Sequence, residues 1–306
     1  MLLLVKYTLL YGIVLMLVAL GGMFSEHSGV INIALEGIMV IGGLGGVLAV
    51  ALLPNTMPPL LIVVISIAVA AVSGMVYSLL LAFASIHLKA DQTIGGTALN
   101  MLATALAIIL AKNFNGSTFS KIDYTNNAFL FSIGGLELSV FVPLGIVLLI
   151  ISYIVMYKTR FGLRLCACGE HPQAADSVGI NVYRMRYAGV LISGVLGGLG
   201  GIVYIIAGVS EWKFENGVAG FGFLALAVMI FGQWKPTRIA LAALLFGFFR
   251  ALGNVYSGFD LLSSLNLPSS VYNMLPYIIS LVVLAFTSQK SRAPKAEGIP
   301  YDKGQR

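Results

Sequence analysis

Residues that could do chemistry are few and scattered along this chain of 306 residues. His27, His87 and His171 lie far apart, with no H-E-x-x-H pair and no acidic cluster, which argues against a metal site. The sequence also lacks a Gly-x-Ser-x-Gly elbow and a Walker A loop. Cys166 and Cys168 are interpreted as reduced thiols, because a C-x-C pair alone is a weak metal signal. We therefore predict no catalytic residue, no bound metal, no cofactor on this chain and no enzymatic activity.

Glu36 lies within a long apolar run, where a charged side chain is costly and needs a reason. Asn32 precedes it by four residues and shares its helix face. Two interpretations remain for this face. It borders a substrate path or gate, or Glu36 is hydrogen-bonded between helices and only holds the fold. The second is favoured, because a single carboxylate cannot form a proton relay.

A weakly polar stripe occupies a later apolar run, where Thr97, Asn100 and Thr104 recur at helical spacing. Such a stripe lines a path or bonds across helices, and the sequence favours neither. Asp91 opens this run and is predicted to cap its helix rather than bind a ligand. The candidate translocation path therefore consists of Asn32, Glu36, Thr97, Asn100 and Thr104.

The loop at residues 158–186 is polar and lies between two apolar runs. Pro172 can start a short helix there, because its missing N–H is not needed in the first turn. Gly179 can end that helix by taking a positive φ. The helix would present Ala174, Ala175 and Val178 as small apolar knobs, a surface suited to docking into a groove of another protein.

Composition places the chain in a membrane. About 58% of its residues are hydrophobic and 10% are charged, whereas soluble domains carry roughly 25% charged residues. The net charge of +6 comes from basic residues in short loops and in the tail, which is typical of membrane proteins and does not indicate nucleic-acid binding.

The fold class predicted from these runs is an all-α polytopic membrane protein with about nine transmembrane helices, since a span needs about 20 apolar residues. The predicted spans are residues 8–24, 31–53, 60–86, 93–111, 138–157, 187–209, 219–233, 237–255 and 271–288. A re-entrant segment near Gly29 would change this count. Residues 1–290 form the transmembrane domain and residues 291–306 a basic cytoplasmic tail.

Lys and Arg set the predicted orientation, because they favour the cytoplasmic side. Three segments are basic and are therefore placed inside: the tail, the loop 158–186 and the hairpin near Lys235. The loop 257–270 has no basic residue and fits the outside. Nine spans then place the N-terminus outside, although Lys6 favours the other side.

Glycine pairs within the spans predict close helix packing, as small residues allow in lipid. Residues 33–42 also resemble residues 224–232 once one position is skipped. The predicted topology gives these two segments opposite directions. That relation is expected of an inverted repeat, although apolar segments match by chance about as readily.

Four stretches resemble the nucleoside or simple-sugar permeases of ABC importers, which belong to the superfamily of ribose and branched-chain amino acid permeases. Residues 24–39 read FSEHSGVINIALEGIM and are similar to the opening motif of that group. Residues 169–181 read GEHPQAADSVGIN and resemble its cytoplasmic coupling segment. Residues 193–201 and 220–232 also match. Cys166 and Cys168 depart from the apolar or small residues expected there.

The resemblance implies a permease subunit of an ATP-driven importer in the bacterial inner membrane, with nucleosides as the favoured cargo. A separate cytoplasmic ATPase would bind the ATP and grip the coupling helix. The other implied partners are a second permease subunit, which is a different paralogue, and an extracytoplasmic substrate-binding lipoprotein. The residues assigned to the ATPase contact are Gly169, Glu170, Pro172, Ala174, Ala175, Asp176, Val178 and Gly179.

Alternatives remain for the cargo and for the class of protein. A ribose-like sugar or a branched-chain amino acid is the other cargo within the ABC interpretation. A secondary transporter working alone would need ion-coupling residues, and a membrane-embedded enzyme would need an acidic or histidine cluster; the sequence provides neither.

Overall fold

The computed structural model describes residues 2–54, 56–115, 121–122, 124, 127–133, 136–208, 213–259, 268–287 and 292–304. The helices of the first half are α1 (Leu2–His27), α2 (Leu35–Leu52), α3 (Pro59–Ile86), α4 (Gln92–Asn115) and α5 (Phe141–Lys158). Those of the second half are α6 (Arg160–Glu170), α7 (Pro172–Ser177), α8 (Val182–Val203), α9 (Phe221–Phe231), α10 (Pro236–Val255) and α12 (Ser269–Thr287). Strands β1 (Leu130–Ile133) and β2 (Leu136–Ser139) form an antiparallel hairpin before α5.

The predicted helical membrane fold is confirmed. Eight segments of the described chain are long and apolar enough to cross a membrane, and α12 occupies the ninth predicted span. Two boundaries differ from the prediction. The second span was expected from residue 31, but residues 28–34 are irregular and α2 begins at Leu35. The fifth was expected from residue 138, where the chain instead forms β2. Some ends of the predicted segments lie outside the described residues, namely residues 209, 288, 290 and 306, as does most of the loop 257–270.

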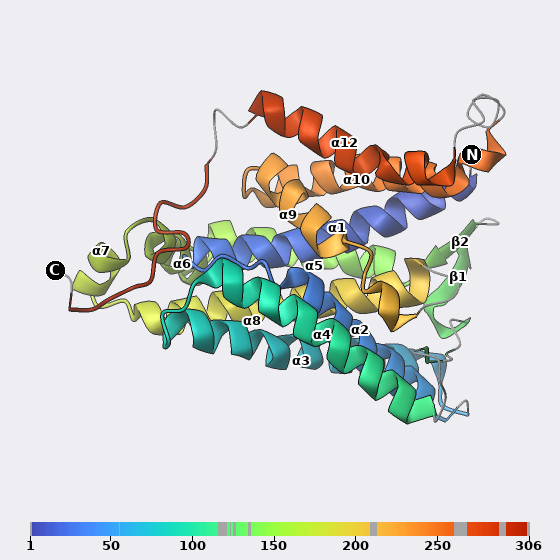
Figure 1. The fold of residues 1–306 in the computed structure, drawn as a ribbon, viewed down its shortest axis with the longest axis horizontal. Coiled ribbons are helices and arrows are strands. Elements are labelled where there is room, and N and C mark those ends of the chain that lie inside the picture. Colours follow the sequence, from blue (N-terminus) through green and yellow to red (C-terminus); the bar gives the residue numbers. More distant parts are fainter. Residues whose placement is uncertain are drawn as a thin grey trace.

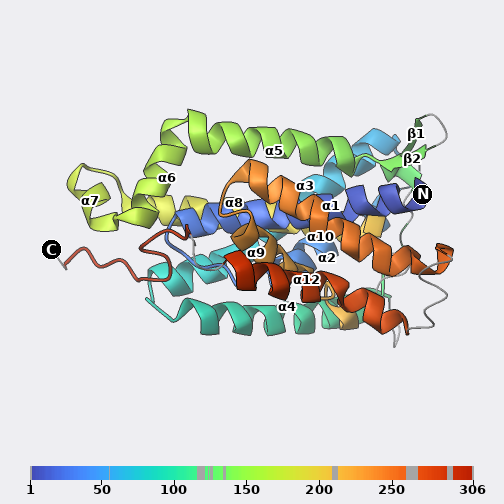
Figure 2. The same cartoon turned by 90° about the horizontal axis from the view of Figure 1, so that it is seen from above.

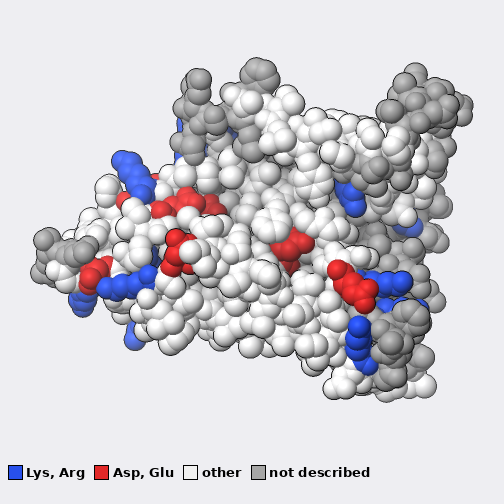
Figure 3. Space-filling view, in the orientation of Figure 1, with Lys and Arg blue, Asp and Glu red and all other residues white. Residues whose placement is uncertain are grey.

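The long helices run roughly along the longest axis of the molecule (Figures 1 and 2). Helix α7 and the C-terminus lie at one end of that axis, and the start of α1 lies at the other. Charged side chains gather mainly toward the two ends of the face in Figure 3, and the middle of that face is mostly uncharged. This distribution fits a bundle that crosses a bilayer lengthwise and places the N-terminus opposite α7, as the predicted topology requires.

At the centre of the bundle, the backbone of α8 packs closely against those of α2 and α3. A Cβ atom on Gly201 of α8 would lie 1.9 Å from the carbonyl oxygen of Met39, and one on Gly198 would lie 2.4 Å from that of Ala70. Neither position can therefore hold a larger residue without moving a backbone. The glycine pairs allow the close packing that the sequence predicted.

Helices α2 and α9, which contain the two similar segments, begin next to each other. Glu36 in the first turn of α2 bonds the amides at the start of α9. From there α2 runs toward the end of α8, where Gly43 packs against Ile205. Helix α9 has 11 residues, or roughly 16 Å, and leads to the hairpin whose Trp234 bonds Glu26 near the end of α1. The two helices thus diverge from a shared starting point.

Candidate functional site

The irregular segment 28–34 between α1 and α2 is held by side chains of neighbouring helices. Gln92 of α4 accepts a hydrogen bond from the Ile31 amide at 2.7 Å. Asn100 of α4 accepts one from the Gly37 amide at 2.7 Å and donates one to the Ile33 carbonyl at 2.9 Å. These bonds satisfy backbone groups that a regular helix would satisfy itself, as buried non-helical chain requires.

Glu36 joins the two diverging helices. Its carboxylate oxygens accept hydrogen bonds from the amides of Gly220 and Gly222, at 2.8 and 2.6 Å. These amides lie at the start of α9, where the N–H groups of a helix lack partners of their own and a negative charge is favoured. Of the two interpretations offered by the sequence, this geometry supports the bond between helices, and the carboxylate also faces the hollow described next.

An open hollow of about 620 Å³ lies between α4 and the starts of α2 and α9. Its lining residues are Glu36, Thr97, Asn100, Met101, Thr104, Ala105, Ile108 and Phe223. Four of the five residues predicted for the path therefore meet around one space. Asn32 does not join them: it is fully buried and donates to the Ser193 hydroxyl at 2.8 Å. Its placement on the path face was wrong, because Asn32 precedes the helix that carries Glu36.

The hollow offers few polar groups that are available to bind a cargo tightly. Both polar ends of Asn100 and both oxygens of Glu36 already bond backbone groups. The hydroxyls of Thr97 and Thr104 donate to carbonyls of their own helix and can still accept a hydrogen bond. The remaining lining atoms are largely apolar, so the space suits a neutral, weakly held cargo better than a charged one.

Sequence reasoning missed Gln92 as a partner of the irregular segment. Gln92 directly follows Asp91, and the sequence analysis predicted only that Asp91 caps the helix that begins there. That cap is confirmed: the Asp91 carboxylate accepts hydrogen bonds from the amides of Thr93 and Ile94 at 2.8 and 2.9 Å.

Arg250, a charged residue within α10, lies over the ring of Phe221 at the start of α9. Its guanidinium carbon is 5.5 Å from the ring centroid.

The short helix predicted in the loop 158–186 is confirmed as α7, with Pro172 as its first residue and Gly179 just past its end at φ +84°. Glu170, Ala174, Val178 and Gly179 are exposed, and Asp176 is half-buried. Val178 is 75% exposed. Gly169, Pro172 and Ala175 are instead buried. The prediction that Ala175 is an exposed knob was wrong, because this face of α7 packs inward against Cys168 and Val182.

A second helix, α6, precedes α7 where the sequence predicted only a loop. Thr159 caps it by accepting a hydrogen bond from the Gly162 amide at 3.3 Å. Cys166 and Cys168 on this helix are free cysteines, and burial raises the pKa of each thiol to about 11. Both therefore remain protonated and weakly reactive at neutral pH.

Apolar helices surround a weakly polar hollow, and a short exposed helix lies at one end of the bundle, an arrangement that fits a polytopic transport permease. The model of the family described as the branched-chain amino acid transport system / permease component matches residues 4–284, so the chain belongs to this family. It is accordingly a multi-pass protein of the cell membrane and the permease subunit of an ABC transporter. Permeases of this class work with an ATPase and a substrate-binding protein.

Relatives named as ABC transporter permeases match nearly the whole chain. The nucleoside ABC transporter permease protein NupC of Lactococcus lactis is 41% identical, covering 96% of this chain and 95% of its own length. The guanosine ABC transporter permease protein NupQ of Bacillus subtilis is 40% identical, with 99% and 97% covered. The putative glucose ABC transporter permease protein TsgC13 of Haloferax volcanii is 30% identical, with 89% and 88% covered.

Proposed function

We propose that this chain is the permease subunit of an ATP-driven importer of nucleosides. The observation that carries the proposal is the identity of 40–41% to relatives named as nucleoside and guanosine permeases, against 30% to one named for glucose. The hollow supports it, because a neutral nucleoside needs hydrogen-bond acceptors and apolar surface but no counter-charge.

The proposed importer pairs this chain with a second permease subunit, a different paralogue, and with an extracytoplasmic substrate-binding lipoprotein. The hollow around Glu36 and Thr97 forms part of the path between the two permeases. Polar groups in it are already bonded, so selectivity rests mainly with the delivery protein. Coupling residues on α7 contact a cytoplasmic ATPase, which binds the ATP.

In the proposed cycle, α7 docks in a cleft of the ATPase through Ala174 and Val178. Closure of the ATPase on ATP moves α7 and the helices attached to it. Glu170 and Asp176 can pair with basic residues of the cleft, but exposed pairs contribute about 0–1 kcal/mol. The apolar contact of Val178 therefore contributes more to docking than these charges do.

The test is uptake of labelled cargo by the assembled importer, in cells that lack other carriers for it. We expect labelled guanosine and uridine to enter in an ATP-dependent manner. Unlabelled nucleosides should compete, whereas ribose, glucose and leucine should not. Uptake of a sugar or of leucine that nucleosides fail to inhibit would overturn the nucleoside assignment and leave the family assignment intact.

A further inference from the structure

The C-terminal segment 292–304, named here the tail strap, crosses the end of the bundle close to α6 and runs toward α7 (Figures 1 and 2). It forms two backbone hydrogen bonds to the body of the protein. The Ala296 amide donates to the Gly169 carbonyl at the end of α6, at 2.8 Å, and the Gly298 amide donates to the Gly29 carbonyl at 3.2 Å. The tail strap therefore joins α6 to the irregular segment 28–34.

The side chain of Tyr301 extends this contact to α7. It is 4% exposed and packs in a small cluster with Cys168, Ala175 and Val182. Its ring also meets that of Tyr183 edge-on, at 5.4 Å between centroids. Ala175 belongs to α7 and Val182 to α8, so a single tail residue fills the space between the coupling helix and the long helix that follows it.

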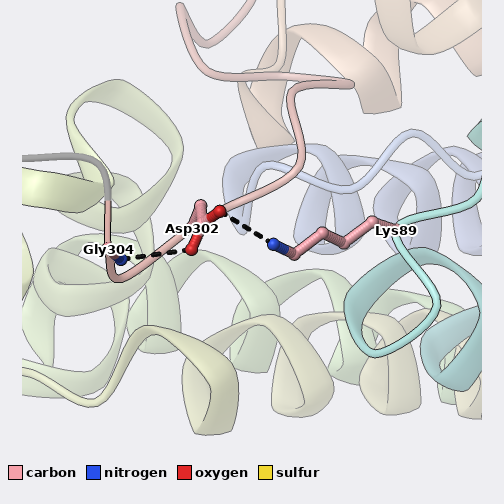
Figure 4. Close-up of polar contacts among 3 residues, drawn as sticks. All are labelled: Lys89, Asp302 and Gly304. Carbon is pink, nitrogen blue, oxygen red and sulfur yellow. Dashed lines mark hydrogen bonds and ion pairs between the residues drawn. The ribbon is translucent and has the colours of Figure 1, made fainter.

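Two further contacts hold the tail strap in place. Lys89 reaches from the α3–α4 loop to the Asp302 carboxylate at 2.9 Å, and the Gly304 amide bonds the same carboxylate (Figure 4). The carboxyl group of Glu297 also lies close enough to that of Glu26, near the end of α1, for the two groups to interact. Burial raises the pKa of Glu297 and so favours its neutral form, which lessens the repulsion between the two groups.

The tail strap also contacts segment 28–34, which directly precedes the helix that carries Glu36. A Cβ atom on Gly298 would lie 2.8 Å from the side chain of Ile31, and Gly298 has a φ of +75°. Ile31 itself bonds Gln92 of α4. A continuous set of contacts thus runs from Ala175 on α7 through Tyr301 and Gly298 to the segment that precedes Glu36.

We propose that the tail strap transmits movement of α7 to segment 28–34 and so opens or closes the hollow. The inference rests on the proposed docking of α7 to the ATPase. The strap is suited to this role because it contacts both α7 and segment 28–34. Lys89 and Glu26 hold it against the rest of the protein. If it were removed, movement of α7 on ATP-driven closure would reach segment 28–34 only through α8, whose Ser193 accepts a hydrogen bond from Asn32.

The test uses Tyr301→Ala in a Cys166→Ala background, in which Cys168 is the only cysteine. Ile299→Ala is the matched control, because Ile299 is a tail residue that is 55% exposed. Both are assembled with the ATPase, the second permease and the binding protein in vesicles. Maleimide labelling of Cys168 reports whether the strap is seated, and cargo moved per ATP hydrolysed reports transmission.

We expect Tyr301→Ala to expose Cys168 to maleimide and to lower the cargo moved per ATP by about fivefold or more, with hydrolysis retained. Ile299→Ala should change neither. Labelled Cys168 together with unchanged cargo per ATP would overturn the proposal. If Tyr301→Ala fails to assemble, Ala296→Pro takes its place, because it removes the amide that bonds Gly169.

A variant of α7's exposed end, Val178→Arg, separates this inference from the proposed function. Normal transport by Val178→Arg would show that α7 does not dock as proposed, and the strap would then have no movement to transmit. Loss of transport in Val178→Arg, with unchanged cargo per ATP in Tyr301→Ala, would overturn the strap alone.

Discussion

The hollow and the short helix α7 use their side chains in opposite ways. Around the hollow, Glu36 and Asn100 are fully engaged with backbone groups of neighbouring helices. At one end of the bundle, Ala174 of α7 and Val178 just after it are exposed. The polar groups of the hollow therefore hold neighbouring helices and leave little to bind cargo, whereas α7 offers the exposed surface that we propose docks to the ATPase.

The largest expected effect concerns the exposed surface of α7. In Val178→Arg a long charged side chain replaces an exposed apolar one, so docking to the ATPase should weaken and uptake should fall by about tenfold or more, equivalent to about 1.4 kcal/mol. Uptake is measured together with the amount of protein in the membrane, which should not change. Val178→Ala is the control and should transport normally. Equal uptake by the two variants would remove α7 from the docking surface.

A second effect tests the hollow. Glu36→Gln leaves one acceptor for two amides and turns an NH₂ group toward an N–H donor. We expect a loss of about 1–3 kcal/mol in the free energy of unfolding, the usual cost of a buried group left unsatisfied. Thermal unfolding in detergent measures this loss, with Thr97→Val as a control expected within about 0.5 kcal/mol. Unchanged stability combined with lost uptake would mean that Glu36 acts on the cargo instead.

A smaller, graded effect is expected at Asn100. Asn100→Asp keeps the acceptor for the Gly37 amide but loses the donor to the Ile33 carbonyl. Asn100→Leu loses both. The Asp variant should therefore cost about 1 kcal/mol in unfolding free energy and the Leu variant about twice that. Equal costs in the same thermal assay would argue against Asn100 as a two-ended support of segment 28–34.

The smallest effect concerns Lys89 and Asp302, which are both partly exposed. The hydrogen bond from Lys89 holds the pKa of Asp302 below its ordinary value. The contact is therefore complete above the ordinary Asp pKa of about 3.9 and is lost as the pH falls through the lowered value. Lys89→Asp should lower cargo moved per ATP less than Tyr301→Ala does, and the reversed pair Lys89→Asp with Asp302→Lys should recover it. A reversed pair no better than Lys89→Asp alone would exclude an electrostatic role.

Much of the fold could be predicted from the sequence, because long apolar runs and short basic loops are determined locally. The same holds for α7, which Pro172 starts and Gly179 ends. The irregular chain at 28–34 could not be predicted, since its hydrogen bonds come from Gln92 and Asn100 on another helix.

Prediction of the site was limited in the same way. Glu36, Thr97, Asn100 and Thr104 were found because polar residues in apolar runs are conspicuous, and they do surround one hollow. The inward turn of Ala175 was missed, because its neighbour Tyr301 lies in a tail more than one hundred residues away, which was interpreted only as a basic extension.

Crosslinking from position 178 tests the central claim most directly. Val178→Cys, in a chain whose Cys166 and Cys168 are replaced by Ala, is treated with a short bifunctional reagent in inside-out vesicles that contain the complete importer. The account predicts a crosslink to the ATPase subunit whose yield changes when ATP is added. A crosslink to the substrate-binding protein, or labelling of Cys at position 178 from outside intact cells, would contradict it.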